Sequence, residues 1–210
     1  MLPKQPEVVS LDPKSLGDVL DDITRVACAT GMAAQAMPIV TGLQRRIDAV
    51  VARAAAAPHQ PRVLHLEWTD PLMCGGHWVP EMVAMAGGIN CFGSKDQGSF
   101  GLDWSDIVAS QPEVILLMPC GFDVTRALED IALLAARPDW ASLPAVQQQR
   151  VYAIDASAYT SRSGPRLVVG LEIIAELLHP DIFSDQIPAA GAVRVPAEQL
   201  TTSTSAAQFG

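Results

Sequence analysis

The side chains best suited to contacting a ligand lie in and after one apolar run. Residues 62–93 read RVLHLEWTDPLMCGGHWVPEMVAMAGGINCFG, which predicts a buried strand over Val63–Trp68, an irregular loop over Thr69–Trp78 and a short helix. In α/β proteins, the loops that follow the carboxyl ends of strands are where small molecules bind. We therefore expect a ligand mouth here, with contacts from Glu67, Trp68, Asp70, His77 and Trp78.

The residue types in this loop suit binding. Trp68 can lie against a flat apolar ligand, because an indole offers a large face and one N–H donor. His77 can hydrogen-bond a ligand or coordinate a metal through its neutral imidazole, and a purely structural hydrogen bond is the alternative. Cys74 and His77 form one Cys-x-x-His pair. A zinc site needs a second pair, so we predict no metal held by the protein alone.

A second candidate loop leaves the most apolar strand, which is predicted over Val114–Met118. Gly121 permits close approach of the backbone to a ligand, and Phe122 can stack on the ligand or fill the core. Cys120 would need a neighbouring base to act as a nucleophile, and the sequence offers none. The sequence also lacks paired carboxylates, a glycine-rich phosphate loop and a Ser/His/Asp set. We therefore predict that the chain is not an enzyme.

A third candidate loop, over 159–166, follows a strand predicted over Val151–Asp155. Its polar side chains, Tyr159 and Arg162 among them, can hold amide or phosphate groups of a ligand. Together the three loops predict that a ligand is buried at the carboxyl edge of the strands.

Alternating strands and helices must position these loops. Apolar residues at helical spacing predict helices from Ser15 to Gly31 and over 33–57, 79–86, 104–110, 124–136, 140–149 and 165–178, and a further short strand is predicted over Ile89–Phe92. The alternation implies an α/β fold with a mostly parallel sheet. We divide the chain into an amino-terminal segment (1–32), a long helix (33–58), an α/β ligand-binding lobe (62–180) and a disordered tail (181–210).

Composition and sequence pattern indicate which kinds of partner the chain can bind and which cell compartment it occupies. The chain has 210 residues, 49% of them hydrophobic, and a net charge of −9; this argues against nucleic-acid binding, which needs a basic surface. No apolar run reaches the length of a membrane span, and the start, MLPKQPEVVSLDP, lacks a signal-peptide pattern. Wide, irregular spacing of the cysteines is typical of free thiols in a reducing compartment, here Cys28, Cys74, Cys91 and Cys120.

Four segments carry a family resemblance: PEVVSLDPKSLGDVLDDI, EWTDPLMCGGHWVPEMVAMAGG, DIVASQPEVILLMPCGF and RVYAIDASAYTSRSGPRLVVGLEIIAELLHP. In order, they look like a lobe-to-helix passage, a ligand loop with its helix, a helix–strand–loop unit, and a closing strand, loop and helix. Over about 6–180 the chain thus resembles the carboxyl-terminal part of cobalamin-binding substrate-binding proteins of ABC importers. In that class III family, one long backbone helix joins two α/β lobes.

The resemblance implies that residues 1–32 are the remnant of a passage from an amino-terminal lobe, which this chain lacks. The chain would then be a carboxyl-terminal lobe that binds cobalamin or another corrinoid, with no covalently bound cofactor. In that case Trp68 would lie against the macrocycle, and His77 would be a candidate ligand of its cobalt. Carried over from the family, Glu81 would dock to arginines of an ABC permease. The resemblance implies the periplasm, whereas the missing signal peptide and the free thiols favour the cytoplasm.

Three alternatives stay open. The same architecture serves haem and iron siderophores, and His77 or Tyr159 would then be the axial ligand of haem iron. A lone lobe would expose the apolar surface that its partner lobe covers, so it could act as an interaction module or a homodimer. An enzyme acting on corrinoids is the third alternative.

Overall fold

The computed structural model describes residues 8–95, 97–184 and 186–201. These residues build a seven-stranded sheet with the order β4-β2-β1-β5-β6-β7, in which β3 also pairs with β1. Strands β1, β3, β5 and β6 run parallel, while β2, β4 and β7 are antiparallel to their neighbours. The strands are β1 Arg62–Thr69, β2 Leu72–Cys74, β3 Ile89–Asn90, β4 Phe100–Gly101, β5 Val114–Leu117, β6 Val151–Ile154 and β7 Ala192–Arg194. The predicted α/β fold with a parallel central sheet is confirmed, and the antiparallel edges go beyond the prediction.

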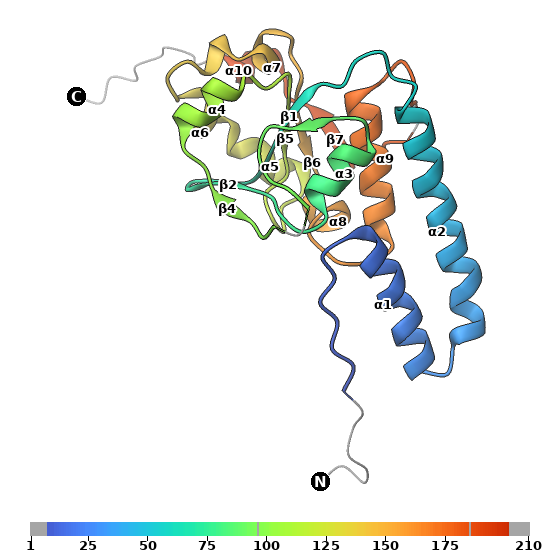
Figure 1. The fold of residues 1–210 in the computed structure, drawn as a ribbon. Coiled ribbons are helices and arrows are strands. Elements are labelled where there is room, and N and C mark those ends of the chain that lie inside the picture. The colour runs from blue at the N-terminus through green and yellow to red at the C-terminus, as the bar shows by residue number, and fades with distance from the viewer. Residues whose placement is uncertain (1–7, 96, 185, 202–210) are drawn as a thin grey trace, which may run out of the picture.

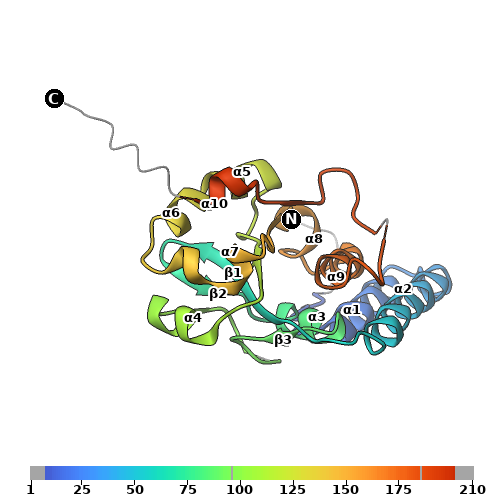
Figure 2. The ribbon, with the colours of Figure 1, turned by 90° about the horizontal axis from the view of Figure 1, so that it is seen from above.

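Successive side chains of the central strands alternate between two cores, because strand residues point to opposite faces in turn. Val63 and Leu116 enter one core, which lies under α1 Leu16–Ala29, α2 Ala33–Ala54, α3 Val79–Met85, α8 Ala156–Tyr159 and α9 Arg166–Leu178. Leu64 and Leu117 enter the other core, under α4 Trp104–Ser110, α5 Val124–Glu129, α6 Ile131–Ala135, the 3₁₀ turn Trp140–Ser142, α7 Pro144–Gln147 and α10 Ala197–Leu200. Figure 2 shows α1, α2 and α9 gathered on one side, and α5, α6 and α10 on the other.

The helical hairpin α1–α2 begins at a capping box. The Ser15 hydroxyl accepts the Asp18 N–H while the Asp18 carboxylate accepts the Ser15 N–H, which fixes the start of α1. Gly31, at φ +73°, makes the turn into α2. Helix α2 then runs back along α9, and the ion pair between Arg46 and Glu172 joins them at 2.6 Å. Figure 1 shows the closed end of the hairpin extending beyond the α/β lobe. Across the described ranges, no helix combines the length and apolarity needed to cross a membrane.

The irregular loop predicted over Thr69–Trp78 is wrong in its first half. Strand β2 folds back on β1 as an antiparallel hairpin, with Thr69 opposite Leu72 and Leu66 opposite Cys74. Leu72 and Cys74 are buried and so stabilise this pairing. A run of three residues is too short for apolar alternation to reveal a strand.

The single helix predicted over 124–136 is also wrong, because the helix is interrupted at Asp130, between α5 and α6. The Asp130 carboxylate accepts the Thr69 hydroxyl at 2.6 Å and the Arg126 guanidinium at 2.6 Å. These bonds tie the break to the end of β1, a tertiary contact that local sequence pattern does not contain.

The disordered tail predicted over 181–210 is wrong for its described part. Strand β7 pairs with β6 at the edge of the sheet, and α10 follows it. Phe183, Val195 and Leu200 are 1%, 1% and 2% exposed. These apolar side chains anchor a segment whose average composition is that of a flexible tail. Residues 202–210 lie outside the described residues.

Candidate ligand-binding site

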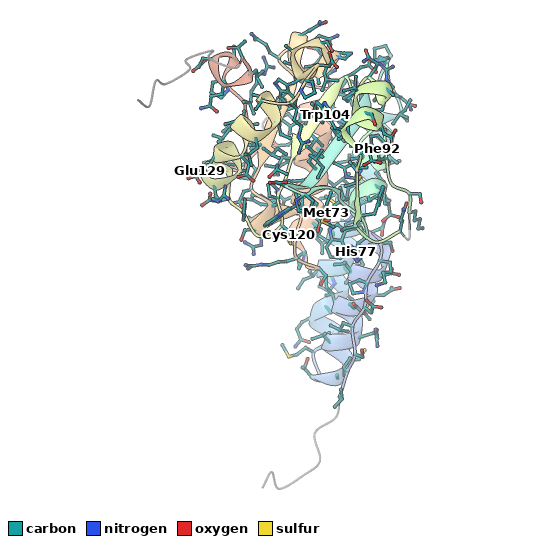
Figure 3. All side chains as sticks on the ribbon, turned by 90° about the vertical axis from the view of Figure 1, so that its left-hand side faces the viewer. Met73, His77, Phe92, Trp104, Cys120 and Glu129 are labelled. Carbon is teal, nitrogen blue, oxygen red and sulfur yellow. The ribbon has the colours of Figure 1, made fainter. Side chains whose placement is uncertain are left out.

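A pocket of about 370 Å³ opens where β1, β5 and β6 end. Parallel strands bring their carboxyl ends to one edge of the sheet, so the loops that follow them meet there. The pocket is lined by Leu11, Asp12, Pro13, Glu67, Gly75, Gly76, His77, Trp78, Val79, Met118, Cys120, Thr160, Ser161 and Ser163. Figure 3 shows His77 and Cys120 at the end of the lobe from which the hairpin extends, with Trp104 toward the other end.

The loop that carries His77 is held in one conformation by its neighbours. A Cβ atom on Gly76 would overlap the backbone of Gly98 and Ser99, so only glycine allows the two segments to pass this closely. The His77 N–H donates to the Gln97 carbonyl at 2.8 Å. His77 itself has φ +56°, a costly value for a residue with a side chain, and such values persist where the surroundings enforce them.

Trp78 joins this loop to the segment between α8 and α9. Its indole N–H donates to the Thr160 carbonyl at 2.7 Å, and its ring centroid lies 5.7 Å from that of His77. Two of the three loops that form the pocket are therefore linked directly, and the His77 imidazole lines the space between them.

Behind the pocket wall lie two side chains, His65 and Cys74, whose pKa values burial shifts toward the neutral form. Burial lowers the pKa of His65 to about 4, so this histidine is neutral near pH 7. Burial, and secondarily the charge of Glu67, raises the pKa of the Cys74 thiol to about 12. The Glu67 carboxylate itself accepts the Ser99 hydroxyl. Cys120, in contrast, is exposed at the pocket and brings a thiol to the ligand side.

Trp68 and Phe122 lie beside the pocket and do not line it. Their ring centroids are 5.2 Å apart, and the Arg126 guanidinium lies 4.2 Å from the centroid of the Phe122 ring. We call Trp68, Phe122 and Arg126 the aromatic shelf. The Gly121 N–H donates to the Ser161 hydroxyl at 3.1 Å, which attaches the shelf to the pocket wall.

Three further predicted contacts lie away from the pocket. Asp70 is exposed in the β1–β2 turn, where its carbonyl accepts the Trp68 indole N–H at 3.0 Å. Tyr159 packs against the core beneath α9. Arg162 is exposed and reaches the Ser157 hydroxyl at 3.5 Å, while its two neighbours in sequence line the pocket.

Glu81 has a structural role in the fold, and its docking to a permease stays a prediction. Its side chain is 14% exposed and lies 3.8 Å from Lys95. Its carboxylate accepts the Leu16 N–H at 2.8 Å, at the positive amino end of α1. Glu81 therefore ties the ligand-loop helix α3 to the helical hairpin.

Sequence reasoning missed several residues of the pocket wall. Leu11, Asp12 and Pro13 reach it from the segment before α1, which no local signal marks as a ligand contact. Met118 follows β5 directly and could have been found from its place between the apolar strand and Cys120. Adjacent residues of a strand point to opposite faces of the sheet. Strand alternation could therefore have shown that Glu67 and Trp68 do not both face the pocket.

The pocket lining offers a metal the His77 imidazole, the Cys120 thiol and the carboxylates of Asp12 and Glu67. In the part of the chain that the structure describes, no group of three or more His, Cys, Asp or Glu side chains could hold a metal ion. One or two protein donors suit a metal whose remaining positions are filled by a macrocycle, as with axial ligands of haem iron.

Comparison with known proteins agrees with this arrangement. The chain matches the model of the family described as periplasmic binding protein over residues 2–158. It is 45% identical, over 97 residues, to an uncharacterized ABC transporter substrate-binding lipoprotein, YvrC, of Bacillus subtilis (strain 168). That match covers 46% of this chain and 30% of the relative.

Two solved structures share the fold. The periplasmic haem-binding protein RhuT from Roseiflexus sp. RS-1, in apo form, has a TM-score of 0.68 and 27% identity, covering 80% of this chain and 65% of that chain. The periplasmic vitamin B12 binding protein BtuF of Vibrio cholerae has a TM-score of 0.66 and 19% identity, covering 82% and 64%. This chain thus spans just under two thirds of either solved chain. On the family match, which extends over more than half of its length, the chain belongs to the periplasmic binding protein family.

Proposed function

We propose that the chain is a ligand-binding lobe of an ABC importer's substrate-binding protein, and that its ligand is a corrinoid of the cobalamin type. The pocket at the carboxyl edge of the sheet carries this proposal, because it combines an aromatic wall, single metal donors and hydroxyl groups. Membership of a family of binding proteins supports the binding role. The fold shared with a vitamin B12 binding protein is compatible with the ligand.

The chemistry of the pocket fits a corrinoid in three respects. Trp78 supplies an aromatic face for the flat, largely apolar ring. The hydroxyls of Ser161 and Ser163 and the Glu67 carboxylate can hydrogen-bond the amide arms of the ring. His77 supplies an imidazole that can hydrogen-bond the ligand or coordinate its cobalt.

The aromatic shelf extends this surface. A corrinoid is larger than the pocket of about 370 Å³, so part of it must lie on the adjoining surface. Trp68 and Phe122 offer ring faces there, and the turn at Cys120 connects them to the pocket wall. In this proposal, the pocket holds one side of the ring and the shelf holds its periphery.

Haem is the second candidate ligand. An imidazole such as that of His77 is an axial ligand type for haem iron, and the 27% identical solved protein is a haem-binding protein. Tyr159 packs against the core and does not line the pocket, so His77 is the residue on which the haem alternative depends.

Titration of the purified chain with cyanocobalamin, aquocobalamin and haemin, by calorimetry and absorbance, tests the proposal. We expect cyanocobalamin to bind with a Kd of about 1 μM, which corresponds to about 8 kcal/mol. We expect Trp78→Phe to weaken binding about tenfold, because it loses the bond that holds the Thr160 loop in place. The matched control is Trp104→Phe, which also loses an indole bond to a backbone carbonyl, that of Pro138, but lies outside the pocket.

The spectra separate the two ligands. Coordination by His77 would change the visible spectrum of aquocobalamin, whose water is exchangeable, and leave that of cyanocobalamin nearly unchanged. Binding of haemin alone, with a Soret shift lost in His77→Ala, would replace the corrinoid by haem. A folded chain that binds none of the three ligands would contradict the proposed function.

A further inference from the structure

A second cavity lies at the opposite edge of the sheet, where β1 and β6 begin. Its volume is about 450 Å³. Most of its charged or titratable lining is basic or phenolic, and one carboxylate is present: His59, Arg150, Tyr152, His179, Arg194 and Asp181. The corrinoid proposed above would bind at the other edge, so this cavity is free for a separate role.

The pairing of β6 with β7 brings two arginines to one end of the sheet. Arg194 in β7 pairs directly with Tyr152 in β6, and Arg150 stands just before the first residue of β6, Val151. Both arginines line the cavity. Tyr152 belongs to the core beneath α9. Because α9 ends at Leu178, this face of the sheet is left open where the arginines emerge.

Neither arginine has a carboxylate partner in the described ranges of the chain. Arg150 donates to the Leu178 carbonyl at 2.9 Å, and Arg194 reaches the Tyr152 hydroxyl at 3.5 Å. Arg46 and Arg126, in contrast, have carboxylate partners, Glu172 and Asp130. The cavity therefore holds two guanidinium groups whose remaining N–H donors can face an anion.

His179 reports the local potential. Burial lowers its pKa, the Gly87 carbonyl opposes that effect, and the positive charges of Arg150 and His59 lower the pKa further. The sign of these last two contributions is that of a positively charged cavity. His59 itself is matched by Glu113 at 2.9 Å, so the positive charge of the cavity comes from the two arginines, against the single carboxylate of Asp181 in its lining.

We propose that this cavity binds a phosphoryl group through Arg150 and Arg194. A guanidinium presents planar, paired N–H donors that match phosphate oxygens. The Tyr152 hydroxyl and the His179 ring add two further polar groups on the same wall. The phosphoryl group belongs either to a small soluble phosphate or to a lipid headgroup.

Titration with inorganic phosphate, replacing chloride at constant ionic strength, tests this directly. We expect a saturable shift of the His179 imidazole proton resonance, assigned with His179→Gln, and a rise in the pKa of His179 as phosphate offsets the positive charge. Arg194 is exposed, so Arg194→Gln leaves the fold intact. We expect this variant to weaken phosphate binding by about tenfold or more.

Arg45→Gln is the matched control, because it removes the same charge from an exposed site on α2 outside the cavity. Sedimentation with vesicles of phosphatidic acid in phosphatidylcholine, against phosphatidylcholine alone, identifies the source. Retention that Arg194→Gln abolishes assigns a lipid headgroup, and saturable phosphate binding without retention assigns a soluble phosphate. The proposal is overturned if neither occurs, or if Arg45→Gln weakens binding as much as Arg194→Gln does.

Discussion

His65 lies fully buried in β1, next to the backbone of Gly75 in the pocket wall. The Asn90 amide donates to the Pro80 carbonyl at 2.9 Å, so its Oδ1 is left to accept, and it lies 3.0 Å from His65 Nε2. Nε2 of the neutral imidazole must therefore carry the proton. This chain of bonds connects β1 to the helix that carries the ligand loop.

The free energy of unfolding should depend on the protonation of His65. Its folded pKa of about 4 lies below the ordinary 6.5, so between these values the unfolded chain binds a proton that the folded chain does not. The contribution is full above pH 6.5 and is lost as the pH falls toward 4. We expect a loss of roughly 2 kcal/mol between pH 7 and pH 5, measured by urea unfolding.

His65→Gln provides the comparison, because its amide can still donate to Asn90 but does not titrate in this range. We expect the variant to lose less stability than the parent between pH 7 and pH 5. His179, whose pKa is also lowered, is present in both proteins, so its contribution cancels in the difference. Equal losses in the two proteins would show that His65 does not titrate as a buried neutral group.

At the scale of elements, close packing of α9 positions the third loop of the pocket. A Cβ atom on Gly170 would overlap the Tyr159 carbonyl oxygen and lie 3.0 Å from the Met82 methyl group. Helix α9 can therefore approach α8 and α3 this closely only with glycine at 170. The turn between α8 and α9, which carries Thr160 and Ser161, inherits its place from this contact.

Gly170→Ala should destabilise the protein by about 1–3 kcal/mol, because the added methyl group must displace the α8 backbone. The matched control is Gly42→Ala in the middle of α2, where an added Cβ meets nothing within 4 Å. This second change should stabilise the protein by about 0.5–1 kcal/mol, since alanine favours the helix over glycine. Chemical denaturation measures both, and destabilisation of similar size in the two variants would refute the packing argument.

At the scale of the whole molecule, the carboxyl-terminal described segment closes the sheet and one of its two cores. Strand β7 covers the edge of β6, and α10 then packs on the face below it. The buried Trp140 indole donates to the Leu200 carbonyl at 3.0 Å, so α10 satisfies a donor as well as filling space. The segment belongs to the folded lobe, and loss of its contacts should lower the free energy of unfolding of the whole lobe.

Leu200→Ala should lower the free energy of unfolding by about 2–4 kcal/mol, as expected for a leucine removed from a core. Leu133→Ala makes the same change at a side chain that is 49% exposed, and it should cost less than about 0.5 kcal/mol. Urea unfolding of both variants measures the difference. Similar small effects would mean that 192–201 contributes little to the stability of the lobe.

Much of the fold could be predicted from local pattern. The apolar runs of β1, β5 and β6, the capping residues before α1 and the long stripe of α2 each carry a signal within a few residues of sequence. The loops at the carboxyl edge could be placed for the same reason, and Glu67, His77, Trp78 and Cys120 do line the pocket. Whether they contact a ligand stays a prediction.

The sequence by itself determined the central strands β1, β5 and β6 and the long helices, and at which edge of the sheet the candidate loops meet. Tertiary structure alone decided which side chains of those loops face the pocket. Trp68 turns to Phe122, Tyr159 turns to the core, and Glu81 binds the amino end of α1. It also decided that 192–201 is ordered. The physical reason is that these outcomes depend on contacts between residues far apart in the chain, whereas propensity and periodicity report only on neighbours.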